Sequence, residues 1–334
     1  MSIDLRELDL ADEQQLRAFH EVTRRAEKED GRDWTRVWTY DEMVSTFCDP
    51  DETERAEACA AYVDGRMVGA GVLYVFLLQD LQKTWLEVYV DPAERRRGVG
   101  SALVDWGVER TRSEGRTQVA SESTYAFELR ESAPAFQFAQ KHGFRVANTE
   151  ICRRLEIPPP DGRLEEIEAE AAAHAEGFTF QSFVGRVPDE LIESYCALNN
   201  KLAIEAPGGE YDWEEESVTP AIHREMERKL AGIGRIRWTT GAVHDGKVVA
   251  LTDLMVTKGE DRASQWSTIV DRDFRGHRLG AAVKVANLRQ VLAAHPELTA
   301  VQTTNAETNA NMVDINERLG FKPIALCPGF LRDL

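Results

Sequence analysis

Apolar residues recur with helical spacing in some segments of the chain and form almost continuous runs in others. Residues 13–27 place apolar side chains three or four positions apart, which predicts an amphipathic helix. The apolar runs 58–63 and 67–78 flank Asp64-Gly65, a pair that favours a tight turn between two antiparallel strands. Further strands are predicted at 85–90 and 153–157, and further helices at 99–113 and 134–141.

The second half of the chain repeats this order of elements. Thr219 followed by Pro220 is typical of a helix N-terminus, and Asp245-Gly246 predicts a second hairpin. Strands that alternate with helices predict an α/β fold. The remaining pattern predicts helices at 189–202, 220–230, 279–294 and 310–318, and strands at 265–270 and 299–304.

Short motifs recur at a nearly constant separation, which indicates a duplicated domain. An arginine followed by a glycine turn stands at the end of one predicted strand in each half. The separations are 180 residues for Arg95 and Arg275 and for Gly100 and Gly280, 181 for the two Asp-Gly turns, and 177 for Gly143-Phe144 and Gly320-Phe321.

Three consecutive prolines, Pro158 to Pro160, interrupt the pattern between the halves, because proline donates no backbone hydrogen bond and holds the chain extended. Residues 164–176, rich in Glu and Ala, predict a short exposed helix. We therefore expect an N-terminal domain at 1–157, a linker at 158–176 and a C-terminal domain at 177–334.

Composition narrows the class of partner. The 334 residues carry 58 acidic and 40 basic side chains, a formal net charge of -18, which disfavours nucleic acid and anionic membranes. A small cationic substrate fits this sign, although a general acidic surface explains it equally well. Residues 67–78 are too short to span a membrane. The five cysteines are widely spaced and odd in number, so we expect reduced thiols, a cytoplasmic protein and no metal site. A monomer and a homodimer both remain open, because a duplicated chain can imitate the pairing of a homodimer internally.

The glycine turns are candidates for anion binding. A turn that leads from a strand into a helix presents unpaired N–H groups and the positive end of the helix dipole, and phosphate is the usual ligand. Neither turn is followed by Gly-Lys-Ser/Thr, and neither has the three spaced glycines of a dinucleotide fingerprint. The alternative interpretation is a tight structural turn with solvated arginines.

The spacing Val90-x-Pro92-x-x-Arg95-x-x-Gly98-x-Gly100 resembles the acyl-CoA pyrophosphate loop of the GNAT superfamily of N-acetyltransferases. Residues 309–321, which begin with Asn309 and close with Leu-Gly-Phe, resemble a later helix of that family. The tandem layout is similar to that of mycothiol synthases. The resemblance implies two tandem domains, each a mixed, largely antiparallel sheet flanked by helices.

The resemblance also implies acetyl-CoA as cofactor, with its pantetheine arm between two diverging strands and its thioester attacked directly by a primary amine. The cofactor-binding residues that it implies are Val88, Val90, Arg95, Arg96, Arg97, Gly98, Val99, Gly100 and Ser101 in the first half, and Ile269, Val270, Arg275, Gly276, His277, Arg278, Leu279, Gly280, Asn309 and Asn316 in the second.

Glu87 is the leading candidate for the base that deprotonates the amine, because family members often place an acid three residues before the position of Val90. Strand alternation puts Glu87 and Tyr89 on one face, so Glu87 faces either a cleft or bulk solvent. The second half has Ser267 at the corresponding position, and Asp253 is the nearest substitute or a structural residue.

The general acid is harder to assign. The family often uses a tyrosine on the later helix, where this chain has Ala139 in the first half and Asn316 in the second; Tyr125 is a weaker candidate. Among the acids of residues 205–216, Glu205, Asp212 and Glu214 either hold a cationic amine or belong to a solvated loop. The sequence thus predicts an acetyl-CoA-dependent N-acetyltransferase acting on a small amine; the alternative is an acyl-CoA sensor or scaffold in which one or both halves are inactive.

Overall fold

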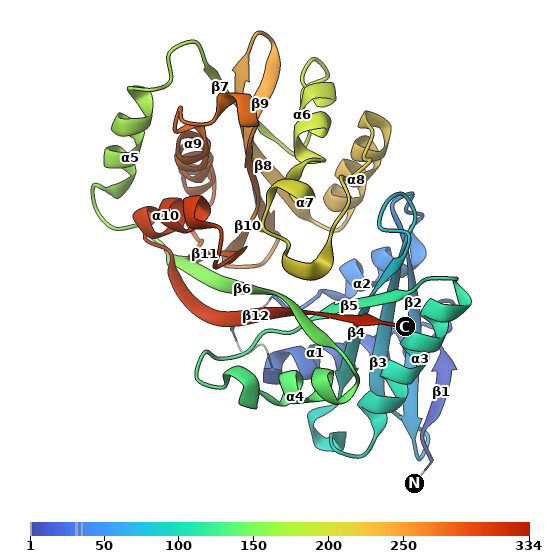
Figure 1. Ribbon diagram of the computed structural model, residues 1–334. Helices are drawn as coiled ribbons and strands as arrows, with labels where there is room; N and C mark the ends of the chain where they lie inside the picture. Colours follow the sequence, from blue (N-terminus) through green and yellow to red (C-terminus); the bar gives the residue numbers. More distant parts are fainter. Residues whose placement is uncertain (1, 31–32, 35) are drawn as a thin grey trace. The chain divides into compact units, whose positions relative to one another are not determined.

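The computed structural model describes residues 2–30, 33–34 and 36–334 (Figure 1). Internal contacts divide the chain into two compact units. Unit 1 contains the chain up to Glu150 together with residues 208–212 and 325–334, and unit 2 contains residues 151–207 and 213–324. Two segments expected in the C-terminal domain therefore belong to unit 1. The end of the chain pairs there as a sheet strand, and Tyr211 of the other segment donates its hydroxyl hydrogen to the carbonyl of Ser121 (2.9 Å).

Unit 1 is built on a sheet in which only one of the neighbouring pairs, β4–β5, is parallel. Its strand order is β1-β2-β3-β4-β5-β12. The strands are β1 (Asp4–Glu7), β2 (Glu54–Val63), β3 (Arg66–Phe76), β4 (Lys83–Val90), β5 (Gln118–Glu122) and β12 (Lys322–Asp333). Strand β6 (Arg145–Glu156) begins in unit 1 and ends in unit 2.

Helices cover both faces of this sheet. Phe19 of α1 and Met43 of α2 pack on Val72 and Ala58, whereas Val104 of α3 packs with residues of the opposite face such as Leu73. The helices of unit 1 are α1 (Glu13–Asp30), α2 (Tyr40–Cys48), α3 (Val99–Ser113) and α4 (Pro134–Lys141), with short 3₁₀ turns at Pro92–Glu94 and Arg130–Ser132.

Unit 2 has the same plan, with strand order β11-β10-β9-β8-β7 and one parallel pair, β10–β11. Its strands are β7 (Thr179–Val184), β8 (Arg235–His244), β9 (Lys247–Thr257), β10 (Arg262–Val270) and β11 (Ala300–Ala306). Its helices are α5 (Arg163–Ala172), α6 (Ile192–Asn199), α7 (Leu202–Glu205), α8 (Pro220–Gly232), α9 (Leu279–Ala294) and α10 (Ala310–Leu319), with a 3₁₀ turn at Arg272–Phe274. A further 3₁₀ turn, Gly209–Tyr211, lies between α7 and α8 in the sequence but belongs to unit 1.

The predicted fold class, two units with mixed and largely antiparallel sheets flanked by helices, is confirmed. Helices α3, α4 and α9 have the predicted bounds, whereas the predicted helix at 189–202 is shorter in the structure, as α6, and α7 begins at the last predicted residue. The predicted linker helix is not simply exposed, since Leu164 and Ile167 of α5 are buried against α9. Among the described residues, no helix has the length and apolar character needed to cross a membrane.

The duplication extends to backbone conformation. The residues of the two Asp-Gly turns all have left-handed φ values, 50° and 77° at Asp64 and Gly65 and 48° and 72° at Asp245 and Gly246. Two-residue hairpins with positive φ at both positions match the twist of the strands they join. A register irregularity follows at Ala61/Tyr62 in one hairpin and at Ala242/Val243 in the other, again 181 residues apart.

Candidate functional site

In each unit the two parallel strands diverge. Pairing of β4 with β5 runs from Lys83↔Gln118 to Trp85↔Ala120, although β4 continues to Val90. Pairing of β10 with β11 likewise ends at Ser264↔Gln302, although β10 continues to Val270. Each unit therefore has a gap in the middle of its sheet, where strand backbone is available to a ligand.

Each gap leads to a glycine turn of the same conformation. Loop 1 (residues 91–98) has left-handed φ at Arg96 (64°) and Gly98 (90°), and loop 2 (residues 271–278) has it at Gly276 (88°) and Arg278 (56°). Glycine occupies one of the two strained positions in each loop. Arg278 thus adopts the conformation of the glycine it replaces, and both loops present first-turn N–H groups of α3 and α9.

The first arginine of each loop braces the turn. The Nε atoms of Arg95 and Arg275 donate to the strand-end carbonyls of Val90 (3.2 Å) and Val270 (3.4 Å). Arg95 also forms a two-pronged ion pair with Asp30 (2.7 and 2.8 Å), and Arg275 binds Glu205 (2.6 Å). The charge predicted to face a pyrophosphate is therefore already balanced by a carboxylate in each loop.

Unit 2 has a cavity of about 480 Å³ at loop 2. Asn309 lines this cavity and also caps α10, because its side chain accepts a hydrogen bond from the N–H of Met312. Other predicted cofactor residues line it too: Ile269, Val270, Arg275, Gly276, Arg278, Leu279 and Gly280.

Two cofactor residues predicted for the second half lie elsewhere. Asn316 is completely buried and donates to Asn305 Oδ1 (3.1 Å), so its side chain does not reach the cavity as placed. His277 is exposed, and its ring lies 5.3 Å from that of Phe178. Neither residue lines the cavity at loop 2, and the burial and contacts that hold them elsewhere do not follow from their spacing.

Gly100, which follows loop 1 in the first turn of α3, is needed for packing. A Cβ at Gly100 would lie 3.1 Å from the Phe138 ring of α4. Ser101 contacts His142 Nε2 through its hydroxyl (3.0 Å), and Val99 is buried, which leaves only its backbone for a ligand. Val88 and Val90 pack against apolar clusters, so they too would offer backbone groups. Arg97 is ion-paired with Glu94.

Four glutamates of unit 1 are linked by electrostatic effects, and we call them the carboxylate cluster: Glu27 of α1, Glu87 of β4, Glu122 of β5 and Glu150 of β6. The charge of Glu87 acts on Glu27 and Glu122, and that of Glu150 acts on Glu122. Burial and the charge of Glu87 raise the pKa of Glu27 to about 7. Burial and the charges of Glu87 and Glu150 raise the pKa of Glu122, which remains accessible to solvent, to about 7. Burial also raises the pKa of Glu150.

Glu87 is at the centre of this electrostatic cluster, next to the gap. It lies on β4 beyond the last β4–β5 pair, opposite Val72, and accepts a hydrogen bond from the Tyr89 hydroxyl (2.9 Å). Burial raises the pKa of Glu87, while hydrogen bonds from Tyr89 and Trp85 oppose the shift. A carboxylate whose pKa is raised towards neutrality is suited to accept a proton from an amine.

Asp253 occupies a different environment in unit 2. It is 1% exposed, and its oxygens accept hydrogen bonds from Tyr195 (2.8 Å) and Thr239 (2.5 Å). In unit 1, Val72 corresponds to Asp253 and Ala58 corresponds to Thr239, and both belong to the apolar core. This geometry favours the structural alternative for Asp253 over a role as a base.

Strand β10 contains a bulge directly opposite Asp253. Leu254 pairs with Gln265 and Thr252 pairs with Thr268, so two residues of β10 face one residue of β9. The corresponding β3–β4 pairing in unit 1 is regular. The bulge turns Trp266 outward, where it is 44% exposed, and buries Ser267.

Tyr125 is 7% exposed and its backbone forms an isolated bridge with Leu326. Burial, with charges on Glu131 and Cys327, raises the pKa of Tyr125 to about 12. A thiol has a pKa of about 8.5, so proton transfer from Tyr125 to a leaving thiolate is uphill. Tyr125 is consequently a poor general acid.

The three acids predicted to bind a cationic substrate lie in different environments. Glu205 lines the cavity of unit 2 and binds both Arg272 and Arg275 (2.6 Å each). Burial opposes ionisation of Glu205, but these hydrogen bonds outweigh it and lower its pKa. Asp212 belongs to unit 1, where its backbone carbonyl accepts from Lys83 Nζ (3.0 Å). Glu214 is exposed in unit 2.

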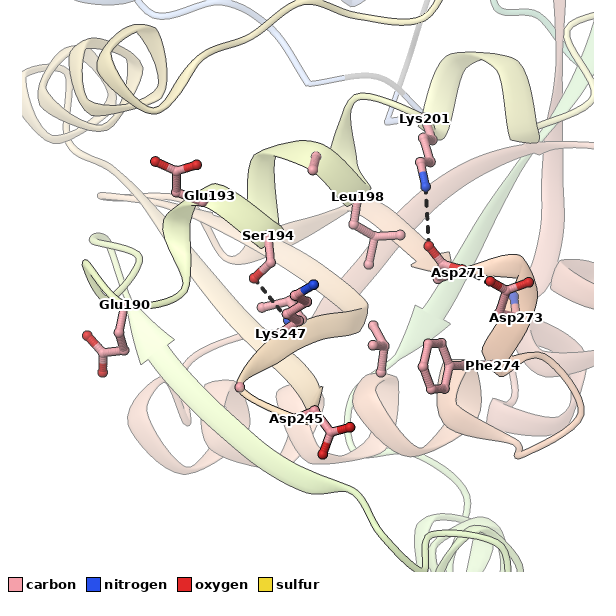
Figure 2. A pocket seen from close by; sticks show the side chains of 14 residues that line it. Glu190, Glu193, Ser194, Leu198, Lys201, Asp245, Lys247, Asp271, Asp273 and Phe274 are labelled. Atoms are coloured by element: carbon pink, nitrogen blue, oxygen red, sulfur yellow. Dashed lines mark hydrogen bonds and ion pairs between the residues drawn. The ribbon is translucent and has the colours of Figure 1, made fainter.

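A second cavity of unit 2, of about 600 Å³, lies between α6, the β8–β9 turn and the segment after β10 (Figure 2). Figure 2 shows Lys201 reaching Asp271, a pair 3.2 Å apart. The side chain of Phe274 lines both cavities and therefore lies between them. Among the described residues, no group of three or more His, Cys, Asp and Glu side chains is arranged to hold a metal ion.

Comparison with known proteins identifies the fold. Residues 54–146 match the family model of the acetyltransferase (GNAT) domain, whereas a search of curated proteins found no match. A tandem GNAT protein from the clavulanic acid biosynthesis pathway, in a structure without acetyl-CoA, is similar at 24% identity and a TM-score of 0.80, over 99% of this chain and 98% of the other.

Two further structures are similar at lower identity. A GCN5-related N-acetyltransferase from Sphaerobacter thermophilus matches at 18% identity and a TM-score of 0.64, over 99% of this chain and 95% of the other. A glucosamine N-acetyltransferase region of a fungal multi-domain β-N-acetylglucosaminidase matches at 17% identity and a TM-score of 0.67, over 98% of this chain and 38% of the other. The chain thus has the tandem GNAT fold, and its first unit contains an acetyltransferase (GNAT) domain.

Proposed function

We propose that the protein is an acetyl-CoA-dependent N-acetyltransferase whose chemistry takes place in unit 1, on a primary amine of a small cationic acceptor. The carboxylate cluster carries this proposal. Glu87 and Glu122 both lie past the point where β4 and β5 stop pairing, which is where a thioester would enter if the pyrophosphate sits at the N-terminus of α3. The GNAT domain match falls on the same unit.

Different residues of unit 1 would bind the cofactor and transfer protons. Loop 1 and the first turn of α3 would hold the pyrophosphate through backbone N–H groups, and the free edges of β4 and β5 would hold the pantetheine arm. Glu87 would take the proton from the acceptor ammonium, so that the neutral amine attacks the thioester carbon and the C–S bond breaks. A protonated carboxyl such as Glu122, with a pKa of about 7, can return a proton to the thiolate.

Unit 2 would bind acyl-CoA without catalysis, which retains the sensor hypothesis for half of the chain. Its cavity at loop 2 favours binding. Asp253, however, is buried and fully hydrogen-bonded, and Asn316 cannot supply a proton near neutral pH.

Calorimetry with acetyl-CoA and a thiol-release assay with polyamines, aminoglycosides and amino acids test the proposal. We expect binding of acetyl-CoA and release of CoA only when an amine acceptor is present. Failure to bind acetyl-CoA at millimolar concentration would refute the proposal for both units. Binding without thiol release across the panel would favour a sensor in both units.

A further inference from the structure

Strand β4 places one carboxyl group between two aromatic hydrogen-bond donors. Trp85, Glu87 and Tyr89 stand at alternate positions of the strand, so their side chains share one face of the sheet. We call these three residues the β4 triplet. The residues that pair with them on β3 all belong to the apolar cluster that α1 and α2 cover, which identifies that face as the one beneath these helices.

The Tyr89 hydroxyl is directed at Glu87. It donates to Glu87 Oε2 over 2.9 Å, and Trp85 donates a second hydrogen bond to the same carboxyl group. The rings of both donors are half-buried against the apolar cluster. Packing fixes the position of such a ring, and its polar end then fixes the group to which it donates. The Glu87 carboxyl group is therefore held in one orientation from within its own strand.

Tyr89 does not itself exchange a proton in the proposed reaction. Burial and the charges of Glu87 and Glu27 raise the pKa of Tyr89 well above its ordinary value near 10. Its hydroxyl keeps its proton near neutral pH and acts on Glu87 only as a donor. A donor favours the ionised form of a carboxyl group. Tyr89 thus favours the form of Glu87 that accepts a proton, against the effect of burial.

The duplicated strand of unit 2 lacks the whole arrangement. When the extra residue of the β10 bulge is allowed for, the residues that correspond to the β4 triplet are Ser264, Ser267 and Ile269. Ile269 is 5% exposed and packs in an apolar cluster. The fold therefore does not require a tyrosine at this position. The aromatic donors and the acid occur together in one unit and are replaced together in the other, which is expected if the donors serve the acid.

We propose that Tyr89 is a positioning residue for acetyl transfer in unit 1: it holds the ionised Glu87 carboxylate in the orientation that receives the proton of the amine, and Trp85 supports it. This inference rests on the proposed role of Glu87 as the base. The proton of the acceptor ammonium passes to Glu87, and the hydroxyl proton of Tyr89 stays on its own oxygen throughout.

The pH dependence of turnover in Tyr89→Phe tests the inference, because phenylalanine keeps the ring and removes only the hydroxyl. Loss of the hydrogen bond should raise the pKa of Glu87 and move the midpoint of kcat/KM to higher pH by about one unit. Removal of a neighbouring negative charge would move it in the opposite direction. Above the midpoint kcat should still fall about tenfold, because the carboxylate is no longer held in one orientation. The KM for acetyl-CoA should not change.

Tyr74→Phe is the matched control. Tyr74 pairs with Trp85 across β3 and β4 and is 7% exposed, but within the described residues the donors to Glu87 are Tyr89 and Trp85. We expect Tyr74→Phe to leave both the midpoint and kcat unchanged. Trp85→Phe offers a second route, with an upward shift smaller than that of Tyr89→Phe.

A carbon-13 NMR titration of the Glu87 carboxyl group measures the same effect without turnover. Its signal is identified by its disappearance in Glu87→Gln. We expect the midpoint of this signal to lie at higher pH in Tyr89→Phe than in the unmodified protein. Because this titration needs neither acetyl-CoA nor an acceptor, it separates the inference from the proposed function.

An unmoved or lowered midpoint in Tyr89→Phe would overturn the inference and leave the proposed function intact. An equal upward shift in Tyr74→Phe would also overturn it, because the effect would then not depend on the hydrogen bond to Glu87. Absence of thiol release by the unmodified protein, together with an upward shift in the NMR titration, would instead refute the proposed function while the action of Tyr89 on Glu87 stands.

Discussion

The gap between the parallel strands has different chemical character in the two units. In unit 1 it is bordered by carboxylates, of which Glu27 and Glu122 have pKa values raised to about 7. In unit 2 Ser267 stands at the position of Glu87, and Asp253 of the neighbouring strand is buried in hydrogen bonds. The loops have nearly the same backbone conformation. Duplication therefore preserved the frame that would hold a CoA ester and changed the side chains that would meet its acyl end.

The largest expected effect separates the two candidate bases. Glu87→Gln should lower kcat by about 10²- to 10⁴-fold, because an amide cannot accept the proton of the amine. Asp253→Asn should leave kcat unchanged and lower the free energy of unfolding by about 3 kcal/mol, because it disrupts a buried network with Arg237 and Tyr195. Steady-state kinetics and urea unfolding measure both. The comparison would fail if Asp253→Asn lost turnover and Glu87→Gln kept it.

The pH dependence of kcat/KM sharpens the contrast further. Glu87 must be ionised to accept a proton from the amine, and burial raises its pKa. We expect kcat/KM to rise with pH, with its midpoint at the raised pKa of Glu87.

In Glu122→Gln the loss of a neighbouring negative charge should move that midpoint to lower pH, because the charges of Glu87 and Glu122 interact and a like charge raises the pKa of a carboxyl group. An unmoved midpoint would place the titrating base outside the carboxylate cluster.

A smaller effect tests loop 2. Glu205→Gln should strengthen CoA binding to unit 2 several-fold, because it frees two arginines and removes a negative charge from the cavity. Since the pKa of Glu205 is lowered, the gain should not vary between pH 6 and 8. Glu193→Gln, in the second cavity (Figure 2), is the matched control and should leave the affinity unchanged. Equal gains from both variants would mean that only net charge matters.

Much of the fold could be predicted from the sequence because its signals are local. The Asp-Gly turns, the glycine loops and the bounds of α3 and α9 follow from short-range conformational preferences. The division into units could not, since the pairing of β12 with β5 joins residues more than 200 positions apart.

The candidate site divides in the same way. The distance of Glu87 from loop 1 is enough to predict it, whereas Glu27, Glu122 and Glu150 come from three other elements and join the carboxylate cluster only through the tertiary fold. Burial of Asn316 and Asp253 likewise depends on tertiary packing. The β10 bulge appears as one extra residue when the two units are compared. Lys83 and Arg262, which begin the pairing of β4 with β5 and of β10 with β11, are 179 positions apart, whereas Val90 and Val270 at the strand ends are 180 apart.

The central claim is that chemistry takes place in unit 1 while unit 2 only binds. Thiol release from acetyl-CoA, measured with the same amine acceptor in Gly98→Asp and in Gly280→Asp, tests it most directly, because each variant puts one carboxylate where a pyrophosphate would bind. The account predicts that Gly98→Asp loses turnover by about a hundredfold or more and that Gly280→Asp retains it. Loss of turnover in Gly280→Asp with full activity in Gly98→Asp would contradict it.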